Sequence, residues 1–257
     1  FQAEDVILDT IHCLVGWEMC IRDRILIINP NTSEQMTDKI RAVAEEAKGH
    51  DCQVTVTCPE HGPITIESSY DEAFAIAPTI DLVKEASEEG YDAIILACFC
   101  EIGVEAAREI SPVLVLGLEE ATLSMALLLG EKFGIMTEKR PRVAMKVRHI
   151  RRYGLLERLA AVRPLELSVA ELAADPEGTK AAGLNLARRM VEEDGAEVII
   201  MGCAAMAGYS DDLERELGVP VLDPLKVSLK VTESLVDLGL THSRVGLFAP
   251  PTPKEIK

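Results

Sequence analysis

The chain has 257 residues, of which 48% are hydrophobic and only 4% aromatic, and its formal net charge is −17. This acidity argues against a nucleic-acid surface, which needs clustered lysine and arginine, and no apolar run reaches the roughly 18 residues that a membrane span requires. A core built mainly from Ile, Leu, Val and Ala is typical of parallel α/β proteins. The length suits one large or two small domains.

The first 23 residues differ in character from the rest of the chain. They contain neither a basic region nor a small-residue cleavage site, so we do not expect a signal peptide. The segment Trp17 to Arg24 resembles the translation of a sequencing-adaptor read-through. We therefore expect residues 1–23 to be a non-native lead-in and leave Cys13 and Cys20 out of the functional argument. A short native amphipathic segment is the alternative.

Strand and helix patterns alternate from residue 24 onward, which predicts a parallel α/β fold. The first half is expected to contain strand 24–28, helix 34–48, strand 53–57, helix 71–89, a strand ending at Cys98, helix 104–110 and strand 112–116. The second half is expected to contain helix 119–129, strand 133–137, helix 139–152, strand 163–167, helix 181–194, a strand ending at Cys203, helix 211–217, strand 219–222 and helix 224–238. The proline-rich end of the chain should be irregular.

Two loops and one basic helix of this pattern bear on function. Asn29 to Ser33 follows the first strand, and its side chains are of the kind that cap the free N–H groups of the next helix. The same groups can also hold an anionic or amide-bearing ligand. His61 lies in a long loop and is expected to be exposed to solvent. The basic residues of helix 139–152 are expected to form a solvated face.

One sequence pattern occurs twice. Glu89 to Cys98 and Asp194 to Cys203 each consist of an acidic residue, a glycine and an apolar run that ends in a small residue and a cysteine. The first strand of each half ends in polar residues, Asn29 to Asn31 in one half and Thr137 in the other. We therefore expect two similar α/β domains related by a pseudo-twofold axis, with the active site in the cleft between them. The first domain would comprise residues 24–117 and 224–257, and the second residues 118–223.

Both repeated cysteines are predicted at the carboxyl end of a buried strand, where ligands bind in open α/β sheets. A single thiol in such a place would usually belong to the core, but two at equivalent positions of a repeat indicate a shared site. Each is followed by a loop and a predicted helix N-terminus, which would lower the thiol pKa from about 8.5 toward neutrality. The chain has seven cysteines, an odd number without the spacing of a disulfide framework, so we expect reduced thiols in the cytoplasm.

Facing thiols can move a proton from one face of a carbon to the other. One thiolate removes the proton α to a carbonyl, and the opposite thiol returns a proton from the other side. The backbone N–H groups of Phe99 and Ala204 are candidates for stabilising the enolate oxygen. We expect no cofactor, because the sequence lacks nucleotide-binding glycine motifs. We also expect no metal, because its Cys and His residues lack zinc-ligand spacing.

Five short motifs occur in a specific order along the chain: Ile28 to Ser33 with Met36-Thr37, Gly62 to Ser68, Ala97-Cys98-Phe99, Arg152 to Leu155, and Met201 to Ala204. Together they resemble the hydantoin racemase branch of the aspartate/glutamate racemase superfamily, and the resemblance extends from Arg24 to about Pro250. It implies two α/β domains with a cleft between them and cofactor-independent racemisation by Cys98 and Cys203. It also implies that the Asn31 loop and the N–H groups after the cysteines hold the substrate.

The expected function is therefore racemisation of a 5-substituted hydantoin, allantoin or a similar cyclic amide. Cys98 and Cys203 would be the opposed acid and base, and the substrate contacts would be Asn31, Phe99, Thr137 and Ala204. Members of this branch commonly follow the first cysteine with Phe, Gly or Asp, Asp, Pro and Gly, whereas this chain has Phe99-Cys100-Glu101-Ile102-Gly103.

Three alternatives remain open at this point. The first is a maleate-isomerase-like or decarboxylase-like enzyme with a nucleophilic cysteine. The second is a racemase of free aspartate or glutamate, and the third is an inactive binding protein of the same fold. The expected partner is a small-molecule substrate in each case, with no nucleic acid and no membrane. A homo-oligomer is a common default for such proteins.

Overall fold

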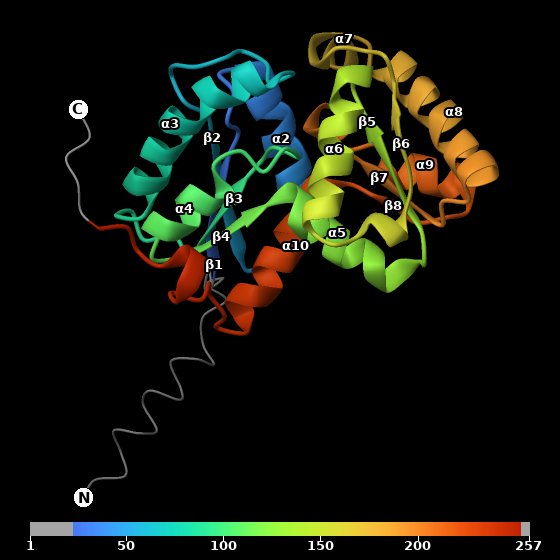
Figure 1. The fold of residues 1–257 in the computed structure, drawn as a ribbon. Coiled ribbons are helices and arrows are strands. Elements are labelled where there is room, and N and C mark those ends of the chain that lie inside the picture. Colours follow the sequence, from blue (N-terminus) through green and yellow to red (C-terminus); the bar gives the residue numbers. More distant parts are fainter. Residues whose placement is uncertain (1–22, 253–257) are drawn as a thin grey trace, which may run out of the picture.

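The computed structural model describes residues 23–252, and the chain forms two halves, each built on its own parallel β-sheet (Figure 1). The predicted lead-in lies outside the described residues, apart from Asp23 at the start of β1. The first half contains β1 (Asp23–Ile28), α2 (Glu34–Ala47), β2 (Cys52–Thr57), α3 (Ser69–Ala86), β3 (Ala93–Leu96), α4 (Val104–Ile110) and β4 (Leu114–Gly117).

The second half repeats this alternation and then returns to the first. It contains α5 (Leu118–Leu129), β5 (Phe133–Thr137), α6 (Arg140–Arg152), β6 (Leu159–Pro164), α7 (Val169–Ala174), α8 (Pro176–Asp194), β7 (Val198–Met201), α9 (Ser210–Leu217), β8 (Val221–Leu222) and α10 (Pro224–Asp237). Three short 3-10 turns complete the described chain: η1 (Leu156–Arg158), η2 (Ala204–Met206) and η3 (Gly246–Phe248).

The two sheets have the same strand order. The first is β2-β1-β3-β4 and the second is β6-β5-β7-β8, and all neighbouring strands pair in parallel. β1 and β5 therefore occupy equivalent places, as do β3 and β7, which precede the two repeated cysteines. The predicted α/β class with two similar parallel-sheet units is confirmed.

Both faces of the first sheet are buried, which explains why its strands have continuous apolar sequences. Ile25 and Ile27 point into a large hydrophobic cluster that continues into the second sheet. Leu26 and Ile28 point the opposite way, into a smaller cluster with α3 and α4. This alternation is the two-residue period of a strand, and it holds the carboxyl ends of β1 and β3 rigidly in place.

The final helix connects the two halves. α10 lies against α2, β3 and β4 of the first half and against α5. Leu225 and Leu229 on this helix are buried in the large cluster that both sheets share. The chain thus returns to the first sheet after completing the second one. The domain boundaries at residues 117–118 and 223–224 stay a prediction.

Three elements of the second half differ from the predicted pattern. The helix expected at 181–194 is α8, which begins earlier, at Pro176. The strand expected at 163–167 is β6, which begins at Leu159 directly after η1. Its alanine-rich start has low intrinsic β propensity, and pairing with β5 decides its conformation instead. α7 is absent from the predicted elements, although Ser168 and Glu171 form the S-x-x-E capping box that signals a helix start.

Two expectations concern the surface of the molecule. His61 is exposed in the loop between β2 and α3, as expected, and it plays no part in the site described below. None of the helices within residues 23–252 is both long enough and apolar enough to cross a membrane.

Candidate active site

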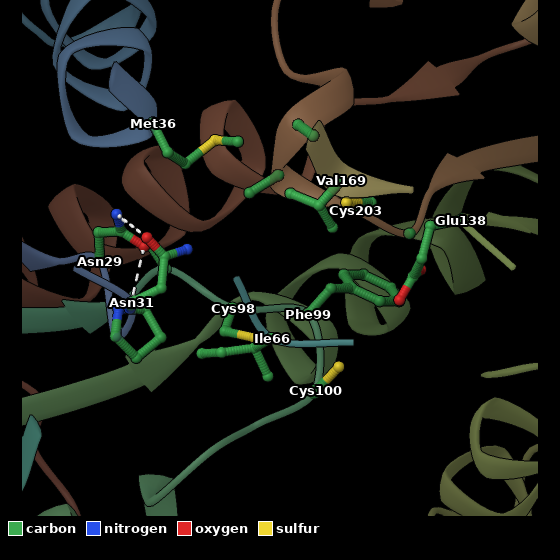
Figure 2. Close-up of a pocket in the computed structure, with 15 residues that line it drawn as sticks. Asn29, Asn31, Met36, Ile66, Cys98, Phe99, Cys100, Glu138, Val169 and Cys203 are labelled. Carbon is green, nitrogen blue, oxygen red and sulfur yellow. Dashed lines mark hydrogen bonds between the residues drawn. The ribbon is translucent and has the colours of Figure 1, made fainter. Parts of the chain in front are cut away.

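A pocket lies where the carboxyl ends of β1, β3, β5 and β7 meet (Figure 2). The space between its walls, including the open mouth, is about 460 Å³. Its wall is formed by residues 29–31 after β1, 97–100 after β3, Glu138 after β5 and 202–205 after β7, with Met36, Ile66 and Val169. Equivalent strand ends of the two halves thus converge on one site.

Most of the residues predicted to form the site line this pocket: Asn31, Cys98, Phe99, Cys203 and Ala204. Thr137 instead lies one residue behind the wall, fully buried, and its hydroxyl donates to Glu138 Oε2 at 2.6 Å. Glu138, which the sequence did not single out, reaches the pocket. No group of three metal-ligating side chains lies together in the described part of the chain.

The two cysteines have the same backbone surroundings. The N–H groups of Cys98 and Cys203 each donate to the carbonyl two residues earlier, both at 2.9 Å. Each thiol in turn accepts the backbone N–H of the residue two positions later, which is Cys100 in the first half and Ala205 in the second. The duplicated sequence therefore produces a duplicated thiol geometry, with one copy entering the pocket from each half.

Gly202 allows Cys203 to sit this close to the neighbouring strand. Its N–H donates to the Met136 carbonyl of β5 at 2.8 Å, and a Cβ at Gly202 would lie 2.5 Å from the same carbonyl oxygen. Such an approach has no room for a side chain, so only glycine keeps β7 and β5 in this register. In the second half, strand packing therefore requires the small residue that precedes the repeated cysteine.

Both thiols are held in their protonated forms. The hydrogen bond with Cys100, together with burial, raises the pKa of Cys98 well above its ordinary value. Burial and the nearby Glu138 carboxylate raise the pKa of Cys203 to about 12. The predicted lowering by a helix N-terminus is wrong, because α4 begins well beyond Cys98 and only the short turn η2 follows Cys203.

The backbone N–H groups next to the cysteines are available to a ligand. Within residues 23–252, neither the Phe99 nor the Ala204 N–H donates to a protein acceptor. Both residues line the pocket, one on each side. Because free N–H groups in a water-poor site are strong donors, they suit an oxygen that gains negative charge.

Asn29 and Asn31 form a buried amide pair at the end of β1 (Figure 2). Asn29 Nδ2 donates to Asn31 Oδ1 at 2.9 Å and to Thr37 Oγ1 at 2.9 Å, and Asn31 Oδ1 also accepts the Ser33 N–H at 2.9 Å. Since the oxygen of Asn31 is engaged by two donors, its amide orientation is fixed. The Asn31 amide nitrogen points away from Asn29 toward the pocket, where it can donate to a ligand carbonyl.

Arg142 on α6 is buried behind the loop that carries Cys98. Its Nη2 donates to Glu72 Oε1 at 2.6 Å and lies 2.8 Å from Cys100 Sγ. Its Nε lies 3.4 Å from Glu138 Oε1. The guanidinium of the second half therefore holds both α3 and the cysteine loop of the first half.

Lys146, one helical turn after Arg142, is fully buried as well. Its ammonium donates to the Phe99 carbonyl, lies 4.2 Å from the centre of the Phe99 ring and is 3.8 Å from Glu119 Oε1. The expectation of a solvated basic face on α6 is wrong for these two residues. Their spacing of four places them on one face of the helix, and that face meets the first half instead of water.

Glu101 is a buried carboxyl beneath the cysteine loop, in a left-handed backbone conformation with φ 54°. Its Oε1 accepts the N–H groups of Glu119 at 2.6 Å and Glu120 at 3.3 Å in the first turn of α5. Its carboxyl fills the space above Gly117, where a Cβ would lie 2.0 Å from Oε2. Burial, with the Glu119 carboxylate nearby, raises the pKa of Glu101 to about 8.

Glu101→Gln is expected to make the protein more stable than wild type at mildly alkaline pH, by roughly 3–5 kcal/mol. Below the ordinary carboxyl pKa of 4.5, native and unfolded wild type both keep the Glu101 proton. Between 4.5 and about 8 only the native protein keeps it, so the free energy of unfolding of wild type falls as pH rises. Glutamine keeps the acceptor oxygen and has no proton to lose.

Urea unfolding at both ends of this pH range measures the effect. Glu105→Gln, at a half-exposed carboxylate on α4, is the matched control and should shift stability by less than about 0.5 kcal/mol. The same pH dependence in wild type and in Glu101→Gln would show that the Glu101 carboxyl does not carry a raised pKa.

Sequence and structure comparisons identify the family of the chain. The Asp/Glu/hydantoin racemase family matches residues 25–232. A hydantoin racemase from Pseudomonas sp. (strain NS671) is 38% identical over 237 residues, which cover 90% of this chain and 93% of that protein. An allantoin racemase from Klebsiella pneumoniae has a TM-score of 0.88 at 33% identity, with 91% of this chain and 96% of that chain covered. An allantoin racemase from Pseudomonas fluorescens has a TM-score of 0.86 at 32% identity, covering 91% and 99%. The chain belongs to the Asp/Glu/hydantoin racemase family.

Proposed function

We propose that this protein is a cofactor-independent racemase of a hydantoin-like or allantoin-like cyclic amide. The observation that carries the proposal is the pair of equivalent thiols, Cys98 and Cys203, that enter one pocket from the two halves. The names of its relatives, hydantoin racemase and allantoin racemase, support a cyclic amide as the substrate class.

The reaction follows from this arrangement. The α-carbon of the substrate lies between the two thiols, and one of them, as thiolate, removes its proton. The enolate oxygen then accepts hydrogen bonds from the N–H groups of Phe99 and Ala204, each worth roughly 3–4 kcal/mol. The other thiol delivers a proton to the opposite face, which inverts the centre. The Asn31 amide nitrogen binds a second carbonyl and keeps the ring in place.

The charge of the wall supports a neutral substrate with N–H donors. Glu138 is the one carboxylate among the described residues that line the pocket, and no Lys or Arg side chain is among them. Arg142 contacts this carboxylate from behind the wall and is only 3% exposed, so a ligand meets the oxygen and not the guanidinium. A ring N–H can donate to Glu138, whereas a substrate carboxylate would be repelled by it. This disfavours aspartate, glutamate, maleate and malonates, the substrates of the alternative enzymes.

Optical rotation tests the proposal. Single enantiomers of 5-substituted hydantoins and of allantoin are expected to lose rotation in the presence of the protein, while L-glutamate and L-aspartate keep theirs. Turnover of the carboxylates without turnover of any cyclic amide would refute the proposal. A stable adduct on one thiol, detected by mass spectrometry, would instead favour a nucleophilic cysteine. Binding of a hydantoin without loss of its α-proton would favour an inactive binding protein.

A further inference from the structure

Cys100 is a third thiol in the pocket wall, two residues after Cys98. Its Sγ lies 2.8 Å from Arg142 Nη2 and 3.7 Å from Lys146 Nζ. Both cationic side chains are almost completely buried, so water screens little of their attraction for an anion. A sulfur in contact with two buried cations is stabilised as a thiolate.

Cys98 and Cys100 also hydrogen-bond each other through their thiols. This bond, followed by the charges of Lys146 and Arg142, lowers the pKa of Cys100 to about 6 in spite of its burial. The same bond raises the pKa of Cys98. The two shifts have opposite directions, so a proton shared by the pair is favoured on Cys98 and a negative charge on Cys100.

Four other titratable groups surround this pair: Glu138 at the end of β5, Cys203 across the pocket, Glu72 on α3 and Glu119 on α5. Glu138 opposes a negative charge on Cys100. The glutamates of α3 and α5 are partners of Arg142 and Lys146 and hold these cations in place. The cations touch the sulfur directly, and their effect on Cys100 prevails.

The second half has no counterpart to this pair. The residue two positions after Cys203 is Ala205, so Cys203 has no thiol beside it on its own loop. Cys203 consequently remains a thiol at neutral pH. The resting site thus has a proton donor on one side and a pair of thiols with a single proton on the other.

We propose that Cys100 is the proton acceptor that converts Cys98 from a thiol into the base of the racemisation, an inference that rests on the proposed function. The S–H bond of Cys98 breaks, an S–H bond forms on Cys100, and the negative charge moves to Cys98. The Cys98 thiolate takes the substrate α-proton while Cys203 delivers its proton to the opposite face. Both thiols of the pair are then protonated and Cys203 is the thiolate, from which the reverse reaction starts. Proton release from Cys100 and proton uptake by Cys203 restore the resting state.

Thiolate absorbance in the ultraviolet, followed through a pH titration of the full chain, locates the charge without any substrate. Wild type is expected to contain one thiolate at neutral pH, and Cys100→Ser should abolish it. Cys98→Ser should keep it, because both cations remain and the serine hydroxyl still donates to Cys100. Cys58→Ser, at a partly exposed thiol outside the pocket, is the matched control and should also keep it. Loss of the thiolate in Cys98→Ser, with retention in Cys100→Ser, would overturn the proposal.

The pH dependence of kcat/KM tests the catalytic consequence. The acid limb of wild type should follow the low pKa of the pair. In Cys100→Ser the pKa of this acid limb should rise by at least about one pH unit. At acidic pH, kcat/KM should therefore be at least about tenfold lower than in wild type, and the difference should shrink as pH rises. A merely structural role would lower kcat/KM by one factor at every pH, and that result would overturn the proposal.

The two experiments also separate this proposal from the proposed function. If wild type turns over no cyclic amide, the proposed function fails, while the thiolate titration still decides whether Cys100 holds the charge. If Cys100→Ser does not fold, as judged by circular dichroism, the titration of Cys98→Ser decides alone. A neutral-pH thiolate in that variant supports the proposal, and its absence overturns it.

Discussion

Cys98→Ala and Cys203→Ala are each expected to lower the rate of racemisation by at least about a thousandfold. In the proposed reaction each variant removes the proton donor or acceptor on one face of the α-carbon, and only Glu138 and Cys100 remain beside the opposite thiol as described titratable side chains of the pocket wall. The chain should still fold, because both side chains are small and partly exposed to the pocket. Polarimetry on a single-enantiomer hydantoin measures the loss.

The two variants should differ in what they retain. Each keeps one thiol, so each should still exchange the α-proton of one enantiomer with solvent, and the two variants should act on opposite enantiomers. Cys58→Ala, outside the pocket, is the control and should racemise like wild type. A Cys98→Ala or Cys203→Ala variant that still inverted its substrate at a substantial rate would show that one thiol suffices.

Lys146→Met is expected to lower the free energy of unfolding by about 3–5 kcal/mol. Lys146 and Glu119 are both fully buried, and Glu119 Oε1 has no hydrogen-bond partner among the described residues, so the ammonium at 3.8 Å is its nearest compensation. Methionine fills a similar volume but leaves Oε1 of the buried carboxylate without compensation, and only His149 Nδ1, 2.7 Å from Oε2, still contacts the group among the described side chains. It also removes the donor to the Phe99 carbonyl, which holds the cysteine loop.

Urea unfolding measures this loss, and two variants calibrate it. Lys84→Met removes a half-exposed ion pair with Asp81 and should cost less than about 1 kcal/mol. The double variant Lys146→Met with Glu119→Gln should regain most of the loss, because no unpaired charge remains. A loss in Lys146→Met no larger than in Lys84→Met would show that Lys146 does not stabilise the buried carboxylate.

The sequence predicted the frame of the site because the frame depends on local patterns. An apolar run followed by a small residue and a cysteine places Cys98 and Cys203 at strand ends whatever surrounds them, and the repeat pairs the two ends. Asn31 followed in the same way from its place between a strand and a helix cap. These inferences require only the period of the strands and the parallel order of the sheet.

The rest of the site depends on contacts between the halves, which no local pattern records. Arg142 and Lys146 lie on a helix that is strongly basic overall, and only the approach of α6 to the first half buries them. Glu138 reaches the pocket because it follows Thr137 at the strand end, where a single residue decides which side chain points inward. The thiol pKa directions were mispredicted because burial and the Cys98–Cys100 contact outweigh distant helix ends.

Racemisation in D2O, stopped early and analysed separately for each enantiomer, tests the two-thiol account most directly. In the proposed reaction, one thiol removes the substrate proton and a different, deuterated thiol delivers a deuteron to the opposite face. The newly formed enantiomer should therefore carry deuterium at the α-carbon from the start, while the remaining starting enantiomer stays protiated. Deuterium that appears in the starting enantiomer as fast as in the product would mean that a single group serves both faces, and would contradict the account.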